Sequence, residues 1–400
     1  MQSNPWCAVR LIEVRAGRIR DPVKRLRFLR RTIRSLPADE VPEVADVADV
    51  ADVAEAPKPA RWRPRAPLLA ASLFFVLAGT VSDAGRVPAA PRASPPAAPR
   101  DPAHVWLVER ARDWELYSNG LRVETLLATS TRPRLYPVLE RATLPEAAWR
   151  WRTEPAGIVF HASEGELASF EPQQNGPLKR QVLGLLDYAR RHGLYHFVVD
   201  RFGRVHRIVE EGDAADHAGQ SVWADSTWVY LNLNAGFLGV AFEAQTSSGG
   251  EAGWISPAQL HAGKVLTEML RSKYRLPAGN CVTHAQVSVN PHNFRIGYHS
   301  DWAHSFPFEQ LGLPDNYRQP LPSLLLFGFG YDPAFLASAG ASLQDALLRA
   351  EEQVRQEAAA RGLTVARWQA ALNRKYRQIS RQTAEARVAF GRPPRPEESP

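Results

Sequence analysis

Residues 282–302, VTHAQVSVNPHNFRIGYHSDW, are the stretch around which this 400-residue chain is best interpreted. Its polar positions include His284, His292, His299 and Asp301. Imidazole and carboxylate groups are the ligands of a catalytic zinc ion that keeps one position open for water. A further candidate, His161, ends the apolar run GIVFH. A strand that ends on an inward-facing histidine, together with a distant histidine–aspartate loop, can supply three ligands to one metal ion.

The composition allows several folded units and does not choose one partner. A chain of this length corresponds to roughly two or three domains, and 44% hydrophobic residues with eleven tryptophans can form a core. The net charge of +7 favours an anionic partner, but it does not distinguish nucleic acid, lipid and cell-wall polymer. Much of the positive charge lies in residues 1–36, and no nucleic-acid-binding motif is present. We therefore expect no nucleic-acid partner.

The N-terminal part shows no globular pattern. Residues 1–60 are a basic segment followed by an acidic low-complexity repeat, VADVADVADVA, and are expected to form a cytoplasmic tail. Within residues 61–83, the uncharged run 66–81 follows three arginines, which predicts a single transmembrane signal-anchor with its N-terminus in the cytoplasm. Residues 84–104 are a Pro/Ala-rich linker. The predicted location is therefore the inner (cytoplasmic) membrane, with the folded part in the periplasm or outside the cell; cleavage after Ala84 stays open.

Residues 150–320 alternate between strand and helix patterns, after a lead-in extension at 105–149. The patterns predict a strand at 157–160, a helix at 177–192, a hairpin of 194–199 with 204–209, strands at 229–233 and 238–244, and a helix at 257–274. Ser256 is the expected N-cap of this last helix, and Pro257 occupies its first position. The order predicts an α/β fold in which helices flank a mixed central sheet.

The C-terminal part is predicted to be helical. Residues 332–390 have the pattern of a helical hairpin, in which Ser342 caps the first helix and Thr364 caps the second. Residues 391–400 are expected to be a disordered tail.

Six motifs between residues 150 and 312 recur in one order in a known family. They are FHAS at His161, YHFVVDRFGRV from Tyr195, DHAG at His217, LGVAF around Gly239, the SPAQL helix, and TH…HSDW. In order and approximate spacing they resemble the zinc-dependent N-acetylmuramoyl-L-alanine amidases of the peptidoglycan recognition protein and phage-amidase superfamily. The resemblance covers less than half of the chain. It implies a Zn²⁺ cofactor and a peptidoglycan or muropeptide substrate.

Residue by residue, the resemblance assigns the zinc ligands to His161, His284 and Asp301. A basic residue two positions before the third ligand falls on His299, where bacterial members usually have lysine. This residue is implied to stabilise negative charge on the substrate. The loop between the second and third ligands is longer than usual, so His292 or His299 stays open as an alternative third ligand.

The resemblance assigns the residue for general acid/base catalysis less directly than it assigns the zinc ligands. One branch of the family has glutamate at the place of Ala241, which cannot transfer a proton. Another branch uses a tyrosine just before the hairpin histidine, and this position is Tyr195. Glu243 lies two residues after Ala241, on the same face of a strand, so it is a second candidate. His217 and Asn234 are candidate substrate contacts.

The function implied by the resemblance is hydrolysis of the amide bond between N-acetylmuramic acid and L-alanine. A different class of function stays open. Family members that lose a zinc ligand bind muropeptides without cutting them, so a non-catalytic recognition module is the alternative.

Overall fold

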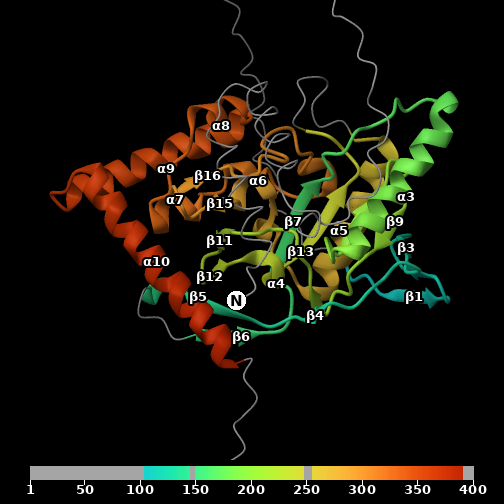
Figure 1. Ribbon diagram of the computed structural model, residues 1–400, viewed down its shortest axis with the longest axis horizontal. Coiled ribbons are helices and arrows are strands. Elements are labelled where there is room, and N and C mark those ends of the chain that lie inside the picture. The colour runs from blue at the N-terminus through green and yellow to red at the C-terminus, as the bar shows by residue number, and fades with distance from the viewer. Residues whose placement is uncertain (1–102, 145–148, 247–254, 391–400) are drawn as a thin grey trace, which may run out of the picture. The chain divides into compact units, whose positions relative to one another are not determined.

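The computed structural model describes residues 103–144, 149–246 and 255–390 (Figure 1). The expected cytoplasmic tail, transmembrane segment and C-terminal tail lie outside the described residues, as does nearly all of the expected linker. These four features stay predictions. In the part of the chain that the structure describes, no helix combines the length and the apolar character needed to cross a membrane.

The largest sheet among the described residues has eight strands. In spatial order they are β1 (Leu107–Arg110), β2 (Trp114–Tyr117), β3 (Arg122–Glu124), β9 (Val205–Arg207), β8 (Phe197–Val199), β13 (Phe237–Phe242), β7 (Gly157–Ala162) and β14 (Cys281–Thr283). The four strands β8, β13, β7 and β14 run parallel, whereas β8 and β9 form an antiparallel hairpin. The predicted mixed central sheet is confirmed, and three strands from the lead-in segment extend its edge.

Helices cover both faces of this sheet. Alternate residues of β7 and β13, such as Ile158 and Val240, share a hydrophobic core with α5 (Pro257–Tyr274). The opposite face, which includes Ala241, packs against α3 (Asn175–Arg191). Because successive side chains of a strand point to opposite faces, each helix contacts its own set of residues. Figure 1 shows α3 and α5 beside the paired arrows of β7 and β13.

The boundaries of α5 follow the sequence prediction closely. Ser256 and Gln259 form a reciprocal capping box, and Pro257 occupies the first turn, where its missing N–H costs no hydrogen bond. The hairpin turn before it packs tightly on the helix: a Cβ at Gly203 would lie 2.7 Å from the backbone oxygen of Ala258. Gly203 also has a φ of +79°, so both its conformation and its surroundings require glycine.

Smaller elements complete the fold around the sheet. They are the sheet β11 (Val222–Ala224), β12 (Trp228–Leu231), β5 (Tyr136–Glu140) and β6 (Trp149–Arg152), the pair β10 (Asp213–Ala214) and β4 (Arg132–Pro133), the pair β15 (Val289–Asn290) and β16 (Arg295–Ile296), and the short helices α4 (Leu233–Gly236), α6 (His284–Val287), α7 (Pro322–Phe327) and α8 (Pro333–Ser338). The sequence did not predict the four-stranded sheet.

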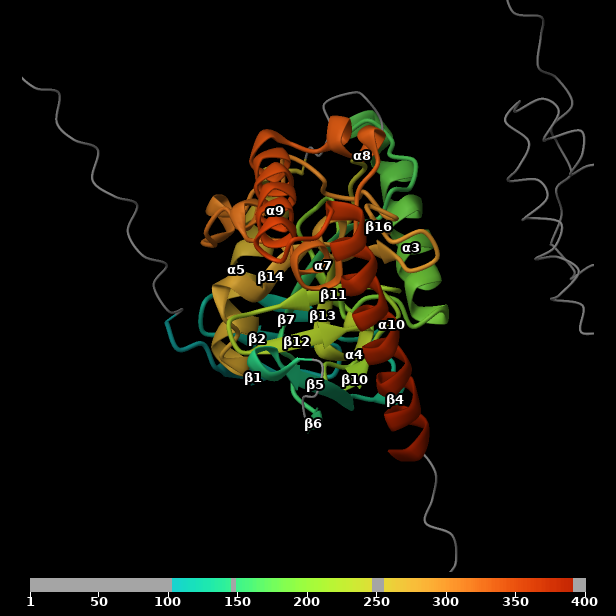
Figure 2. The same ribbon diagram turned by 90° about the vertical axis from the view of Figure 1, so that its left-hand side faces the viewer.

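The C-terminal part forms the expected pair of helices, α9 (Ala341–Ala360) and α10 (Val365–Phe390). They pack on each other and on α7, and α10 also contacts β5 (Figure 2). Thr364 caps α10, because its hydroxyl accepts a hydrogen bond from the Arg367 N–H at 3.3 Å. The predicted cap of α9 was wrong. The helix begins one residue before Ser342, whose hydroxyl donates to Asp315 at 2.8 Å instead.

Candidate metal centre

The register of the parallel strands brings two of the predicted ligands together. Val282 on β14 pairs with Val159 on β7, so these two residues lie side by side on the same face of the sheet. Two residues further along each strand direction are His284 and His161. A step of two residues returns a side chain to the same face. Both histidines therefore lie where the parallel strands end, one at the start of α6 and one near the end of β7.

The third predicted ligand, Asp301, lies in the loop after β16. The next residue, Trp302, is fully buried among aromatic side chains, including Phe242 and Phe306. Its carbonyl accepts a hydrogen bond from the Tyr317 hydroxyl at 2.7 Å. The Asp301 carbonyl accepts one from the Ala285 N–H at 3.2 Å. The buried indole and these two hydrogen bonds fix the loop, and so hold the Asp301 carboxylate beside α6.

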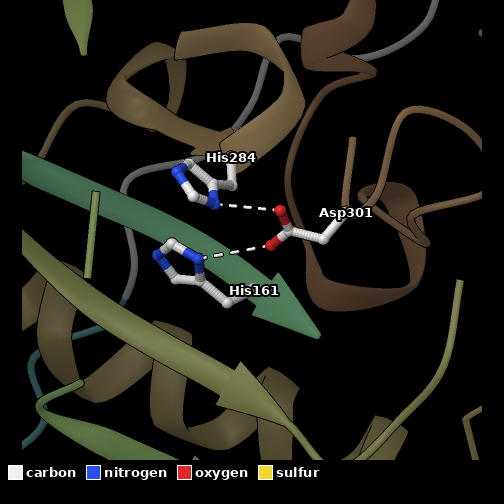
Figure 3. Close-up of side chains that lie close together, drawn as sticks. All are labelled: His161, His284 and Asp301. Carbon is white, nitrogen blue, oxygen red and sulfur yellow. Dashed lines mark ion pairs between the residues drawn. The ribbon is translucent and has the colours of Figure 1, made fainter. Parts of the chain in front are cut away.

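His161, His284 and Asp301 form one buried cluster (Figure 3). One potential ligand atom of each residue lies within 4.8 Å of those of the other two. The carboxylate faces both rings: Oδ1 is 2.9 Å from Nδ1 of His284, and Oδ2 is 3.3 Å from Nδ1 of His161. Burial raises the pKa of Asp301, but the neighbouring histidines outweigh it and lower that pKa far below its ordinary value. The carboxylate is therefore ionised at neutral pH.

A chain of hydrogen bonds determines which nitrogen of His161 carries the proton. Nε2 of His217 is 3.2 Å from the carbonyl oxygen of Phe237, which can only accept a hydrogen bond, so this nitrogen is protonated. Burial holds the pKa of His217 well below its ordinary value, so its Nδ1 is unprotonated and accepts. That Nδ1 is 3.0 Å from Nε2 of His161, which must donate. The Nδ1 of His161 is left with its lone pair.

This arrangement fits a bound cation. Burial, and then the charge of His284, lower the pKa of His161 to about 4, so the ring is neutral at neutral pH. Its Nδ1 lone pair then faces a carboxylate oxygen of Asp301, and a cation between two such donors replaces repulsion with coordination. In addition, Nε2 of His284 is buried and has no hydrogen-bond partner among the described residues. Two imidazoles and one carboxylate are the donor set of a catalytic zinc site.

Tyr195 lies beside this cluster, with its ring centroid 5.1 Å from that of His161. Burial, and then the negative charge of Asp301, raise the pKa of Tyr195. Its backbone has a φ of +56°, a conformation that is strained for a tyrosine. The turn before β8 thus places this side chain next to the predicted ligands.

Glu243 follows β13 and is buried, but its carboxylate is engaged in the β8–β9 turn. It accepts a hydrogen bond from the Arg201 N–H at 3.0 Å. Burial raises the pKa of Glu243 to about 7, in spite of this hydrogen bond. A carboxyl group with such a pKa suits general acid/base chemistry. The pKa therefore does not exclude Glu243 as the acid/base residue, and its position relative to the ligand cluster must decide between it and Tyr195.

The two alternative ligands differ in position. The His299 ring is stacked on that of His284, with centroids 4.7 Å apart and an angle of 17° between the planes. It lies at the exposed edge of the cluster, and partial burial lowers its pKa. His292 is exposed in a turn, where its N–H donates to the Asn290 side chain at 3.0 Å. Within the described residues, the group of side chains that could hold a metal ion comprises His161, His284 and Asp301 and does not include His292.

The two expected substrate contacts are both engaged within the protein. The side-chain oxygen of Asn234 accepts hydrogen bonds from the N–H groups of His217, Ala218 and Gly219, at 3.1, 2.6 and 3.2 Å. Both ring nitrogens of His217 have protein partners, as described above. Asn234 thus holds the loop that carries His217, and His217 orients His161. Sequence reasoning missed this last contact, because no spacing signal relates the DHAG motif to the first strand. Their role as substrate contacts stays a prediction.

Comparison with known families assigns this part of the chain. Residues 151–301 match the family model described as N-acetylmuramoyl-L-alanine amidase, Amidase_2. This stretch is an Amidase_2 domain. The match begins in β6 and ends on Asp301 itself, so the domain includes all three members of the cluster. The segment after Asp301, with α7 to α10, lies outside the family match.

Several solved structures are similar to this chain, including two that are named as N-acetylmuramoyl-L-alanine amidases, LysC and AmiD. AmpDh3 from Pseudomonas aeruginosa, in complex with anhydromuramic pentapeptide, is 20% identical over 53% of this chain and 88% of its own, with a TM-score of 0.35. AmiD from E. coli, with the substrate anhydro-N-acetylmuramic acid-L-Ala-D-γ-Glu-L-Lys, is 22% identical over 49% and 72%, with a TM-score of 0.31. LysC from Clostridium intestinale is 20% identical over 40% and 83%, with a TM-score of 0.25. A search of curated proteins found no match.

Proposed function

We propose that this protein is a zinc-dependent amidase that hydrolyses the bond between N-acetylmuramic acid and L-alanine in peptidoglycan or muropeptides. The observation that carries the proposal is the buried cluster of His161, His284 and Asp301 at the ends of two parallel strands of an Amidase_2 domain. A neutral His161 imidazole beside an ionised carboxylate suits zinc better than a structural ion pair, because a lone pair of His161 faces the carboxylate. A recognition module that has lost a ligand would lack this complete donor set.

The three ligands would hold zinc with one position free. Zinc held there would supply Lewis-acid chemistry, which would lower the pKa of water toward ~7 and polarise the scissile carbonyl. The chain must then stabilise the negative charge that grows on the carbonyl oxygen. His299, stacked on His284 at the exposed edge, is placed to do so, because an imidazole has at least one N–H donor in either protonation state.

The leaving amine needs a proton, and Tyr195 is the first candidate to deliver it. Its raised pKa means that the hydroxyl stays protonated at neutral pH and can donate. Its ring lies next to His161, on the side of the ligand cluster. Glu243 is the second candidate, since its pKa of about 7 is suitable but its carboxylate is bonded to the Arg201 N–H. We therefore assign the transfer to Tyr195.

The proposed location is the periplasmic side of the inner membrane. The support comes from the sequence alone: the uncharged run 66–81 follows three arginines, and a Pro/Ala-rich linker connects it to the folded part. A tethered domain on that side of the membrane would lie close to the wall polymer that it is proposed to cut.

Digestion of a defined muropeptide by the full-length protein tests this function. Mass spectrometry of the products is expected to detect a peptide with a free L-alanine amine and the matching muramic acid carboxylate. Replacing Tyr195 with Phe is expected to lower kcat by about 10²–10⁴, the usual contribution of general acid/base catalysis. The Glu243→Gln replacement, which keeps an oxygen acceptor for Arg201, is expected to lower kcat less.

Two other outcomes have definite meanings. A zinc-loaded protein that binds the muropeptide but releases no peptide would contradict the amidase and favour the recognition module. If Glu243→Gln lowers kcat more than Tyr195→Phe does, the proton transfer belongs to Glu243.

A further inference from the structure

A cavity of about 590 Å³ adjoins the metal cluster on the side of the C-terminal helices. One wall is formed by the β15–β16 region and the loop after it, including Tyr298 and His299. The opposite wall is formed by α10, including Arg377 and Arg381. His299 belongs to both sites, because its ring lines the cavity and stacks on the predicted ligand His284. A molecule in the cavity would therefore lie next to the cluster.

The wall formed by α10 is cationic. Arg377 and Arg381 are four residues apart on one helix, so their side chains extend from the same face. The Arg377 guanidinium lies over the Phe294 ring, 4.6 Å from its centroid, which restricts its position. Within the described part of the chain, neither arginine forms an ion pair with a carboxylate. Two guanidinium groups on one side of a cavity favour an anionic ligand.

The opposite wall presents an exposed aromatic ring. Tyr298 is 65% exposed, although it belongs to a short loop between two well-packed segments. Its ring meets that of His299 edge-on, with centroids 4.8 Å apart. An aromatic side chain exposed in a cavity can pack against the aliphatic part of a ligand whose charged groups pair with arginine. A short peptide with free carboxylates has this mixed character.

We propose that the cavity binds the stem peptide of a muropeptide, with Arg377 and Arg381 pairing with its free carboxylates. This inference rests on the proposed function, and it names the part of the substrate that the C-terminal helices would recognise. The compound in the AmiD complex shows the relevant chemistry: a γ-linked glutamate keeps its α-carboxylate free, and the last residue adds another. The scissile amide lies at the other end of such a peptide, where it would meet the cluster beyond His299.

One wall of this subsite lies outside the Amidase_2 domain, whereas the other wall belongs to the domain. The family match ends at residue 301, whereas the cationic wall comes from α10. The C-terminal helices would then have a definite role: they would select muropeptides whose stem peptide is long enough and anionic enough to reach α10.

A binding experiment with matched ligands and variants tests the subsite. The full-length, zinc-loaded protein is titrated by calorimetry with the peptide L-Ala-D-γ-Glu-L-Lys, which lacks the scissile bond, and with the same peptide after conversion of both free carboxylates to carboxamides. Removing one hydrogen-bonded guanidinium is expected to weaken binding of the carboxylate form about tenfold or more in Arg381→Ala. The carboxamide form is expected to bind wild type and Arg381→Ala with equal affinity.

Arg374→Ala is the matched control. Arg374 is exposed on the same helix, but it does not line the cavity, so its loss is expected to leave both affinities unchanged. Arg381→Lys keeps the charge without the planar fork and is expected to restore part of the affinity. Arg381 is exposed and makes no ion pair with any residue that the structure describes, so neither variant is expected to unfold the protein.

The readout separates this inference from the proposed function. Equal binding of the carboxylate form to wild type and Arg381→Ala would overturn the subsite, even if the protein cleaves muropeptides. No binding of either ligand to wild type would also overturn it. Binding that depends on Arg381, in a protein that cleaves nothing, would support the subsite while contradicting the amidase.

Discussion

At the scale of single residues, the position of one proton determines whether His161 can bind a metal. The Phe237 carbonyl fixes the proton on Nε2 of His217, and His217 in turn fixes the proton on Nε2 of His161. Partners of this kind set the tautomer and orientation of a metal-binding imidazole. These two hydrogen bonds thus leave Nδ1 of His161 unprotonated, with its lone pair facing Asp301.

Replacing His217 with Ala is expected to weaken zinc binding about 10–100-fold, as loss of an orienting partner usually does. Zinc affinity is measured by competition with a chelator of known affinity, a readout that does not depend on turnover. His217→Gln, whose amide can both accept and donate, is expected to recover part of the affinity. Unchanged zinc affinity in a folded His217→Ala protein would contradict the orienting role.

The sequence identified the predicted ligands but not their partners. His161, His284 and Asp301 belong to motifs whose order and spacing are recognisable along the chain, and the structure brings all three together. The contact between His161 and His217 joins residues 56 positions apart. It depends on how a loop folds over β13, and no local pattern encodes that.

At the scale of elements, the lack of a side chain at Gly239 on β13 leaves room for the imidazole ring of His217. A Cβ placed on Gly239 would lie 2.6 Å from Cγ of His217, closer than two such atoms can approach. The backbone N–H of Gly239 also donates to Nδ1 of His196 at 2.9 Å. The strand therefore passes directly beneath the imidazoles and can do so only with glycine at this position.

The Gly239→Ala replacement is expected to lower the free energy of unfolding by about 2 kcal/mol, because it overpacks a buried site. It is also expected to weaken zinc binding by displacing the His217 ring. Gly184→Ala in α3 is the control: nothing lies within 4 Å of its added Cβ. That change is expected to raise stability by about 0.5–1 kcal/mol, through helix propensity alone. Chemical denaturation of both variants measures the difference, and a neutral Gly239→Ala would contradict the close packing.

Elements with strong local signals were predicted well. The capped start of α5 and the β8–β9 hairpin follow from Ser256, Pro257 and the turn around Gly203. The prediction that Ser342 caps α9 was wrong because the Ser342 hydroxyl donates to Asp315, a partner that no local sequence rule reveals. The sheet β11–β12–β5–β6 was missed because its strands have only three to five residues each, and because β12 pairs with β5, a strand far away in the sequence.

At the scale of the whole folded part, a buried ionic network connects the first strands to the core. Arg207 on β9 donates to Glu115 on β2 and to Glu211, each at 2.8 Å. Glu211 also accepts hydrogen bonds from Lys273 and Tyr274 at the end of α5. Burial opposes ionisation of Glu211, but Arg207 and Lys273 outweigh it and lower its pKa to about 2. The network thus joins the edge strands, the hairpin and α5.

Because the folded pKa of Glu211 is below its ordinary value, its contribution to stability is present above about pH 4.5 and is lost as the pH falls toward 2. Glu211→Gln is expected to cost about 3 kcal/mol at pH 7, since it leaves Arg207 with a weaker partner in a buried site. This cost is expected to shrink as the pH falls through that window. Urea denaturation at several pH values measures it.

The control is Glu352→Gln, which removes an exposed ion pair with Arg355 and is expected to cost about 0–1 kcal/mol. A Glu211→Gln cost that stays constant from pH 7 to pH 2 would show that the network does not depend on the ionised carboxylate.

Zinc content of the full-length protein is the most direct test of the central claim, that His161, His284 and Asp301 form a zinc site. It is measured by mass spectrometry of the purified protein, beside His284→Ala and His292→Ala. We expect about one zinc per chain in wild type and in His292→Ala, because three ligands hold one ion, and little or none in His284→Ala. A wild-type protein without zinc, or a His284→Ala protein that keeps it, would show that these three residues do not form a zinc site.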